Sequence, residues 1–418
     1  GQLTGLDNDG IPGNAGSTYV ANLGAPREFT TDADLYSAFL QGTWTINDTM
    51  RLTLGGRYSY EKKSGSRKID FVDYDTGVSR DEPAPGLGGG TDAVAGLVFL
   101  AERHDLSGSR SESTFSPSIN FQWDVGDSMV YATLTRGFKS GGYDARSNAS
   151  PDPDDNIGGV DVPPGSFEFD REQADSLEIG SKNSFFDGRW ELNIAAFYTR
   201  YKDLQVSIFD GTLGFNVGNA GAATTMGIEL DGRVAITDNL TMTYAAALLD
   251  FEFTDFEDGQ CYQDRVNAGR FPTEDNNGAA APDRIENGTA FCDYEGFTNQ
   301  YAADFGGNVS FIYNKEVAQS LELRGNFDVV FTTDYNSSQN LDPSQEQDGY
   351  AKINARVAVA HLEDNWDFAI VGKNLTNETT ISYSNDTPLA NGNFGAVGHY
   401  GIVDSPRTIG FQITKRWY

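Results

Sequence analysis

The chain has 418 residues with 30 Lys or Arg against 61 Asp or Glu, which gives a formal net charge of −31. This balance argues against a nucleic-acid partner, because binding a phosphate backbone requires a basic face. The longest apolar run, 93–101, is far shorter than the roughly 20 residues of a membrane-spanning helix. Aromatic residues make up 12% and glycines number 47, a composition typical of strands, tight turns and interfacial aromatic girdles.

Residues 1–33 are rich in Gly, Asn and Asp without any period, so we expect a loop. They show no basic start followed by an apolar run, so no signal peptide is predicted. The stretch 6–10 (LDNDG) has part of a calcium-loop composition but lacks the remaining ligand spacing. A weak loop calcium site is therefore the only cofactor considered.

Period-two alternation begins at Asp34. The segment 34–46 places Tyr36, Leu40 and Trp44 on one face and polar residues on the other. The segment 49–62 repeats the pattern but puts Arg51 and Arg57 on its polar face. Arginines facing a dry core would be strongly destabilising, whereas arginines facing a water-filled lumen are ordinary. The pattern thus predicts strands with lipid on one side and water on the other.

The same rhythm of long loop, strand, short turn and strand continues along the chain. The predicted pairs are 34–46 with 49–62, 113–124 with 129–139, 172–186 with 189–207, 221–236 with 240–254, 299–313 with 320–335, and 350–362 with 365–380, followed by the final strand 406–418. The segment 314–319 is interpreted as a turn. We therefore predict an all-β, transmembrane antiparallel β-barrel, with about thirteen strands visible, short periplasmic turns and long extracellular loops.

The strand count is odd, and both the first and the last predicted strand run inward. Single-chain bacterial barrels have an even number of strands and begin in the periplasm, so we expect strands upstream of this sequence. The final strand would close the barrel against its first strand.

Acidic residues concentrate in the predicted loops, as at Asp152, Asp154, Asp155 and Asp161. Their simplest role is loop solubility. The alternative is bridging through divalent cations to anionic lipopolysaccharide.

The two cysteines, Cys261 and Cys292, lie in one turn-rich segment. Such a pair indicates a loop disulfide in an oxidising compartment. Two free thiols, or half of a metal site, remain the alternatives.

No catalytic constellation is found, so the chain is not expected to be an enzyme. The three histidines, His104, His361 and His399, are distributed over two loops and a strand end without metal-ligand spacing. They are interpreted as surface or interfacial residues, and no metal site is predicted.

Several stretches resemble the TonB-dependent outer-membrane receptors. Residues 131–143 (YATLTRGFKSGGY) resemble a strand-to-loop signature of the family, and 215–232 (FNVGNAGAATTMGIELDG) its Asn-Ala … Gly-Ile-Glu strand. Residues 372–378 (GKNLTNE) are similar to the penultimate-strand motif. The terminal strand resembles the assembly signal read by the barrel-insertion machinery, here carried by Phe411, Ile413, Trp417 and Tyr418. In the register of this strand, the outward face carries Trp417 and not the last residue.

The resemblance covers about residues 34–418 and implies a barrel of 22 strands in the outer membrane of a Gram-negative bacterium. It implies that residues 1–33 are the remnant of an extracellular loop and 34–418 the C-terminal part of the barrel. It also implies an N-terminal plug outside this sequence, through which the TonB, ExbB and ExbD complex would act. Further implied partners are the barrel-assembly machinery, outer-membrane lipid and lipopolysaccharide, and a small-molecule ligand.

A ligand would bind where loops and strand ends converge on the lumen. The candidates by chemistry are Tyr143, Asp144, Arg146, Phe209, Asn219 and Tyr335. The alternative is that the aromatic candidates belong to the outer aromatic girdle. A ferric siderophore is the leading ligand class, ahead of an oligosaccharide and a corrinoid, and a passive porin or a surface adhesin are the other functions considered.

Overall fold

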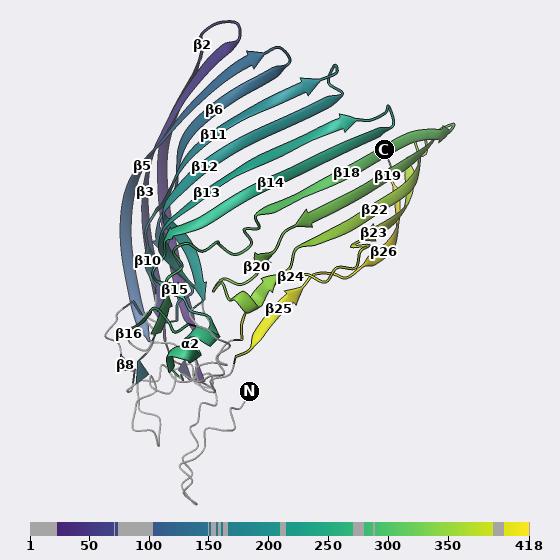
Figure 1. Ribbon diagram of the computed structural model, residues 1–418. Helices are drawn as coiled ribbons and strands as arrows, with labels where there is room; N and C mark the ends of the chain where they lie inside the picture. The colour runs from purple at the N-terminus through teal and green to yellow at the C-terminus, as the bar shows by residue number, and fades with distance from the viewer. Residues whose placement is uncertain are drawn as a thin grey trace, which may run out of the picture.

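The computed structural model describes residues 23–417 except 71, 74–102, 149, 152–155, 158–159, 162–165, 210–214, 271–279, 287–288 and 388–396. Its main feature is an antiparallel sheet of 13 strands, in which each strand pairs with its neighbours along the chain (Figure 1). In spatial order the strands are β2 (Arg27–Thr45), β3 (Met50–Ile69), β5 (His104–Val125), β6 (Ser128–Lys139), β11 (Glu172–Phe185), β12 (Trp190–Phe209), β13 (Phe215–Ala235), β14 (Leu240–Asp255), β18 (Phe305–Ala318), β19 (Leu321–Thr332), β22 (Tyr350–His361), β23 (Trp366–Lys373) and β26 (Thr408–Lys415). The all-β fold and its up-and-down antiparallel order are as predicted.

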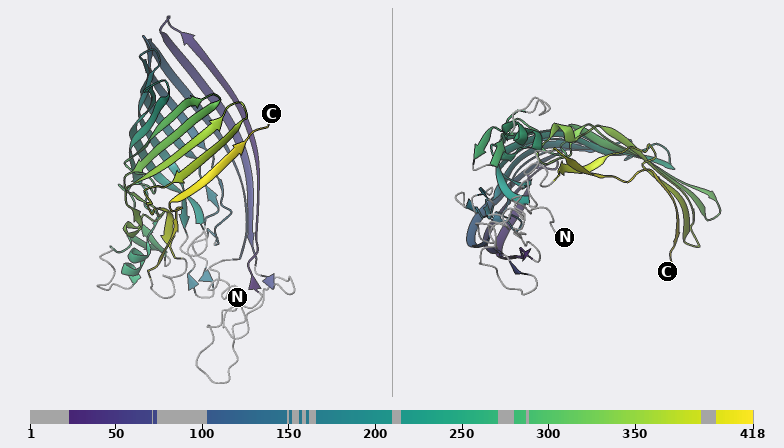
Figure 2. Two further views of the ribbon diagram at one scale, coloured as in Figure 1. Left: turned by 90° about the vertical axis from the view of Figure 1, so that its right-hand side faces the viewer. Right: turned by 90° about the horizontal axis from the view of Figure 1, so that it is seen from below.

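Seen end-on, the sheet is an open arc (Figure 2). Within the described residues, β2 pairs only with β3 and β26 only with β23, so the two edge strands do not pair with each other. Closure of the barrel by β26 against a first strand upstream of these residues stays a prediction.

The sheet has one apolar and one polar face because side chains alternate along each strand. Ile194 of β12 and Leu230 of β13 are paired and exposed on the apolar face. On the opposite face Arg51 donates to Asp124 at 2.7 Å, and the Tyr131 hydroxyl donates to Glu178 at 2.7 Å. Such ion pairs and hydrogen bonds line the face opposite Ile194 and Leu230, as a lipid-facing sheet with a wet interior requires.

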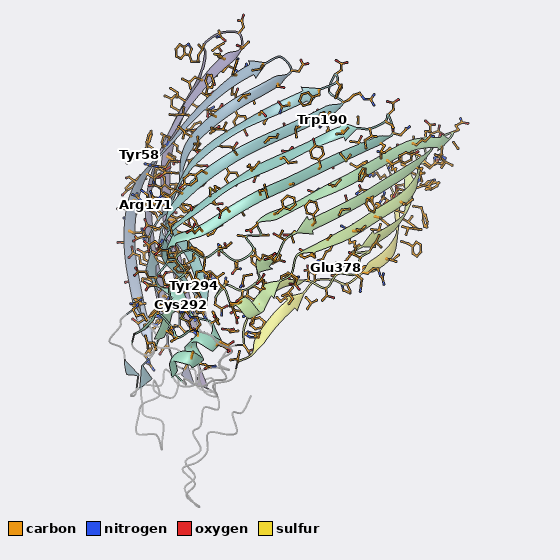
Figure 3. The ribbon with its side chains drawn as sticks, viewed as in Figure 1. Tyr58, Arg171, Trp190, Cys292, Tyr294 and Glu378 are labelled. Atoms are coloured by element: carbon orange, nitrogen blue, oxygen red, sulfur yellow. A yellow bond between two sulfur atoms is a disulfide. The ribbon has the colours of Figure 1, made fainter. Side chains whose placement is uncertain are left out.

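The two ends of the sheet differ in their connections. At one end, which we call the turn end, short turns join the strands; examples are 126–127 with Gly126 at φ 60° and 319–320 with Ser320 at φ 62°. At the other end, the loop end, lie the long connections 70–103, 140–171, 256–304, 333–349 and 374–407, together with the short 210–214. Figure 3 shows Trp190 near the turn end and Cys292 and Tyr294 at the loop end.

Several predicted strand boundaries were wrong at the loop end. β2 begins at Arg27 and not at 34. β3 ends at Ile69 and β5 begins at His104, so the connection between the strands predicted at 49–62 and 113–124 is shorter than expected. The predicted turn 314–319 was also wrong, because β18 continues to Ala318 through a register shift between Glu316 and Ala318. These extensions are mostly polar, and backbone pairing continues without the apolar alternation that identified the strands.

Small elements fold over the loop end. They are β1 (Leu23–Gly24), β4 (Val72–Asp73), β7 (Gly142–Tyr143), β8 (Asn156–Ile157), β9 (Val160–Asp161), β10 (Glu168–Phe169), β15 (Gly259–Gln260), α2 (Gln263–Arg270), β16 (Arg284–Glu286), β17 (Thr289–Cys292), β20 (Tyr335–Asn336), η1 (Pro343–Gln345), β21 (Glu346–Gln347), β24 (Ile381–Asp386) and β25 (His399–Val403). None of the described helices has the length and apolar composition that a bilayer crossing requires.

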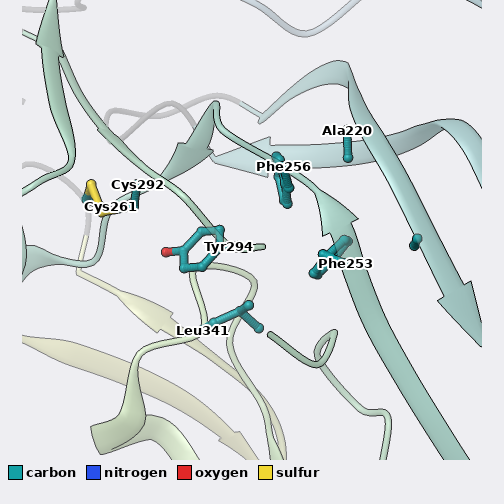
Figure 4. Close-up of a cluster of buried hydrophobic side chains, with 8 residues drawn as sticks. Ala220, Phe253, Phe256, Cys261, Cys292, Tyr294 and Leu341 are labelled. Carbon is teal, nitrogen blue, oxygen red and sulfur yellow. A yellow bond between two sulfur atoms is a disulfide. The ribbon is translucent and has the colours of Figure 1, made fainter. Parts of the chain in front are cut away.

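The buried apolar cluster also lies at the loop end. It joins the ends of β13 and β14 to the connections 256–304 and 333–349, through Ala220, Ala223, Phe253, Phe256, Cys261, Cys292, Tyr294 and Leu341 (Figure 4). The packed interior of this chain is therefore where its loops meet.

Candidate ligand-binding site

A buried arginine ties the first long loops to the sheet. Arg67 of β3 has no exposed surface, and its guanidinium donates to the carbonyl oxygens of Asp144 at 2.8 Å and Ser166 at 2.7 Å. It also donates to His104 Nε2 at 2.9 Å and lies over the ring of Phe167. Because Arg67 and Arg51 are an even number of residues apart on β3, both lie on its polar face. The connection 140–171 thus folds inward, over the polar side of the sheet.

Tyr143 lies on this inner side and not in an outer girdle. Its ring covers Gly65 of β3 and Gly108 of β5, where an added Cβ would come within 2.5 and 2.8 Å of ring atoms. Its ring centroid is 5.0 Å from that of Phe167, and the residue is only 8% exposed. Burial raises the pKa of the Tyr143 hydroxyl. The side chain packs a loop onto the sheet, and its hydroxyl is buried without a hydrogen-bond partner in the protein.

Asp144 and Asn219 are occupied by hydrogen bonds within the protein. The Asp144 carboxylate accepts from the Arg146 N–H at 3.0 Å and the Ser166 hydroxyl at 2.8 Å. The Asn219 amide donates to the carbonyls of Asp170 and Asp203 at 3.0 and 2.8 Å, and its oxygen accepts from the Asp170 N–H. Both residues hold loop backbone in place, and a ligand-binding role for them stays a prediction.

A cavity of about 330 Å³ lies beside the apolar cluster. Its lining consists of Leu204, Gln205, Val206, Ser207, Phe253, Phe256, Gln260, Tyr294, Asn299, Gln300, Tyr301, Gln339 and Leu341. Among these described lining residues there is no Asp, Glu, Lys, Arg or His. The Oε1 atom of Gln339 is buried and has no hydrogen-bond partner in the protein. Aromatic rings with amide donors and acceptors suit an uncharged, hydrogen-bonding ligand group.

Two of the predicted ligand residues adjoin this cavity. Arg146 donates to the Ser207 hydroxyl at 3.1 Å, and Tyr335 packs edge-on against Tyr301 with ring centroids 6.0 Å apart. Phe209 pairs with Phe215 through the backbone at the end of β12, and its side chain lies outside the described residues. Arg146 and Tyr335 are therefore brought towards one site, whereas Tyr143, Asp144 and Asn219 serve the loop framework.

The structure joins Cys261 and Cys292 in a disulfide, with Cα atoms 5.1 Å apart. Both residues are buried beside Tyr294, whose hydroxyl lies 2.5 Å from the Gln260 carbonyl oxygen and 2.7 Å from that of Asn340. Burial raises the pKa of the Tyr294 hydroxyl, which stays a protonated donor. The disulfide thus supports one wall of the cavity.

None of the residues that line the cavity was identified from the sequence. Gln205, Phe253, Tyr294, Tyr301 and Gln339 come from separate strands and loops. The one available signal was the cysteine pair, because a cross-linked loop segment with nearby aromatics marks a packed region.

His399 is exposed, as the sequence suggested, but it lies beside two carboxylates. Its Nδ1 atom lies 3.2 Å from Asp386 Oδ1 and 3.7 Å from Asp342 Oδ2. Asp342 and Asp386 are 1% and 3% exposed. Burial and the neighbouring Asp342 charge raise the pKa of Asp386 to about 6, although His399 opposes this rise. Asp342 belongs to one loop, and Asp386 and His399 belong to another. No spacing in the sequence could therefore show that the three residues lie close together.

The remaining predicted positions are placed as follows. Phe411 and Ile413 point from the apolar face of β26 and Trp417 follows that strand, all three strongly exposed, while Tyr418 lies outside the described residues. The stretch 6–10 and Asp152, Asp154 and Asp155 also lie outside them, and Asp161 is in β9. Neither the assembly signal nor a calcium site is tested by these positions.

Residues 2–375 match the family described as "TonB dependent receptor-like, beta-barrel". The chain belongs to this family. The stretches that carried the resemblance, 131–143, 215–232 and 372–378, span β6, β13 and the end of β23 with the loop segments next to them. The family places the chain in the outer membrane of a Gram-negative bacterium. Because barrels of this membrane have short periplasmic turns, the turn end is periplasmic and the loop end extracellular.

Three similar proteins illustrate the relationship. The pesticin receptor of Yersinia enterocolitica is 24% identical over 228 residues, which are 54% of this chain and 27% of that protein. The ferric yersiniabactin uptake receptor FyuA from Yersinia pestis has a TM-score of 0.65 at 15% identity, with 94% of this chain and 47% of that chain covered. The siderophore receptor PiuA from Acinetobacter baumannii has a TM-score of 0.56 at 14% identity, with coverage of 92% and 43%. The chain spans about half the length or less of these TonB-dependent receptor relatives, and at these identities the solved structures show the fold alone.

Proposed function

We propose that this chain forms the C-terminal part of the barrel of a TonB-dependent importer that takes up a scarce ligand, a ferric siderophore. The observation that carries the proposal is the family match over residues 2–375. The relatives named as siderophore receptors support the ligand class. In this proposal, further strands and a plug precede these residues in the whole protein, and the TonB, ExbB and ExbD complex acts through the plug.

The cavity at the loop end is the proposed point of first contact with the ligand. Its lining offers aromatic faces and amide groups and carries no formal charge, while the whole chain has a net charge of −31. A strongly anionic chelate would be repelled at long range, whereas a neutral or weakly charged chelate would not. We therefore favour a chelate whose outer groups are aromatic or amide in character.

A deletion strain tests this proposal. Growth would be measured on iron supplied as different ferric chelates and, separately, on glycans as carbon source. The expected result is a growth defect with one class of ferric chelate, which the wild-type gene restores. Uptake of that chelate by the restored strain should stop when the proton gradient is collapsed. A defect on glycans only would mean that the imported ligand is an oligosaccharide and not a ferric chelate. Uptake that survives loss of the gradient would indicate a passive porin. No defect on any nutrient would overturn active import.

The cavity itself is tested by a matched pair of variants. Gln339→Leu keeps a similar volume but removes the amide from the cavity, whereas Gln412→Leu makes the same change on β26, away from the cavity. We expect Gln339→Leu to lower the affinity for the imported chelate about tenfold, because a lost hydrogen bond to a buried group costs about 1–3 kcal/mol. Gln412→Leu should bind like the wild type. If both variants bind the chelate equally well, the cavity does not take part in ligand recognition.

A further inference from the structure

Three extracellular loops meet at the buried side chains of Asp342, Asp386 and Gln345 and the exposed side chain of His399, which together we call the Asp–His cluster. Asp342 and Gln345 belong to the connection 333–349, and Asp386 and His399 to the connection 374–407. The third loop, 256–304, reaches the cluster through the N–H of Gln263 at the start of α2, which donates to Asp386 Oδ2 at 3.1 Å. We propose that the Asp–His cluster binds one divalent transition-metal cation of the zinc type, which holds these three loops together.

The distances between the candidate ligand atoms fit a four-coordinate ion. Ligands at about 2.0–2.1 Å from a tetrahedral zinc ion are roughly 3.3–3.4 Å from one another. His399 Nδ1 lies 3.2 Å from Asp386 Oδ1 and 3.7 Å from Asp342 Oδ2. The Gln345 amide group lies 3.2 Å from Asp342 Oδ2 and 3.3 Å from Asp386 Oδ1. These four separations are within a few tenths of an ångström of the tetrahedral edge.

The Gln345 amide supplies an independent sign of a ligand. Gln345 is 5% exposed, and its Oε1 atom is buried without any hydrogen-bond partner. Its nitrogen is the end directed at the two carboxylates. Because the two ends of an amide are nearly alike in shape, a half-turn of the group exchanges them. That turn would give the unpartnered oxygen a place among the ligand atoms, as a fourth ligand beside the cation.

Each candidate ligand is oriented by a second contact, as metal ligands usually are. The other oxygen of Asp342 accepts from the N–H and the hydroxyl of Ser344, both at 2.8 Å. The other oxygen of Asp386 accepts from Asn340 Nδ2 at 2.7 Å in addition to the Gln263 N–H. His399 Nε2 lies 3.4 Å from the Ser344 hydroxyl. One oxygen of each carboxylate and one nitrogen of the imidazole therefore remain directed at a common centre.

The donor set favours a zinc-like ion over calcium or magnesium. Calcium takes six to eight oxygen ligands, and magnesium keeps an octahedral shell with several waters. An imidazole nitrogen beside two carboxylates is instead typical of zinc and its neighbours in the first transition row. A dication would also neutralise two carboxylates that are almost completely buried side by side, which is costly for uncompensated charges.

The cation would act on the cavity wall as well as on the loops. Asn340, which orients Asp386, has its carbonyl oxygen 2.7 Å from the Tyr294 hydroxyl. Tyr294, Gln339 and Leu341 line the cavity. Order in the Asp–His cluster therefore propagates directly into the cavity wall. This inference concerns the loop framework and holds whatever ligand is imported.

The test uses the full-length protein purified from outer membranes in detergent and stripped with a chelator. Zinc chloride and calcium chloride are titrated separately by calorimetry, and amide hydrogen exchange is followed in the three loops. We expect one zinc ion bound for each chain, little response to calcium, and slower exchange in 256–304, 333–349 and 374–407 on zinc addition. Failure to bind zinc, or binding without protection of these loops, would overturn the proposal.

Variants assign the binding to the cluster. Removing a residue that only orients a metal ligand typically weakens metal binding by roughly 10–100-fold. His399→Gln and Asp386→Asn remove ligands themselves and should weaken zinc binding by more than this. His361→Gln is the matched control, since His361 also faces a carboxylate, Asp364, but at the turn end. Gln345→Glu adds a carboxylate in place of the amide and should strengthen zinc binding, which gives a readout even where a loss-of-ligand variant folds poorly. Unchanged binding in His399→Gln, or no gain in Gln345→Glu, would contradict the assignment.

Discussion

Gly65 shows how a single residue fixes the position of a loop on this sheet. Its lack of a side chain admits the Tyr143 ring, because an added Cβ would lie 2.5 Å from ring atoms. Gly42 on β2 has no heavy atom within 4 Å of such a Cβ. The two glycines therefore differ in what a methyl group would meet, although both lie within strands of the same sheet.

We expect Gly65→Ala to destabilise the loop packing by about 1–3 kcal/mol, the usual cost of an overpacked site. Gly42→Ala should be neutral or slightly stabilising. The free energy of unfolding in urea, measured in lipid vesicles, checks the difference. In the double variant Gly65→Ala/Tyr143→Ala the two losses should not add, since the clash is gone. Additive losses would mean that Tyr143 does not rest on Gly65.

At the scale of the strand, the position of one residue decides whether a charge meets lipid or water. Ile194 lies on the apolar face of β12, while its neighbour Asn193 faces the polar side and donates to Asp231 at 3.0 Å. Ile194→Arg should cost about 2–4 kcal/mol in a bilayer, the penalty for arginine near the membrane midplane. Asn193→Arg should cost much less, because Asp231 can pair with it. Reconstitution in vesicles followed by urea unfolding compares them, and a larger loss for Asn193→Arg would reverse the assignment of the faces.

The disulfide joins Cys261, which directly follows β15, to Cys292 at the end of β17. Replacing both cysteines, Cys261→Ser and Cys292→Ser, opens a loop with a sequence separation of 31. Chain-entropy estimates for loops of this size are about 3–4 kcal/mol. We expect faster proteolysis within 256–304 and weaker binding of the imported chelate, with little change in the unfolding of the strands. Reduction of the wild-type protein serves as the control and should reproduce the effect, whereas protease resistance in both would show that packing alone holds the loop.

The strands were predictable from sequence to the extent that one face is apolar. Ile409, Phe411 and Ile413 of β26 identify a strand by alternation, and the structure exposes all three. The extension of β3 to Ile69 has no such pattern, because residues 61–68 pair through the backbone with polar side chains on both faces. The surroundings of His399 and the cavity could not be predicted from the sequence, since they depend on contacts between residues far apart in it. A strand that faces lipid on one side shows an alternating pattern in the sequence, whereas packing between loops produces no periodic pattern.

For the whole molecule, the decisive feature is the pair of unpaired edges. β2 has 19 residues and pairs only with β3, and β26 pairs only with β23 within the described residues. A long exposed edge is a template for association with other strands. In a bilayer it is also costly, because unpaired backbone groups cannot bond to water there. We have proposed that upstream strands of the same protein cover these edges.

Residues 1–418 produced alone in detergent should therefore associate through their edges and give mixed oligomers. The same residues preceded by the upstream part of their own gene should give a monomer that migrates faster on gels before heating than after it, as folded barrels do. The physical reason is that edge pairing is satisfied within one chain in the second case and only between chains in the first. Size-exclusion chromatography with light scattering distinguishes the two states. A monodisperse, heat-modifiable monomer from residues 1–418 alone would mean that β2 and β26 can pair with each other, and the thirteen strands would then form a barrel by themselves.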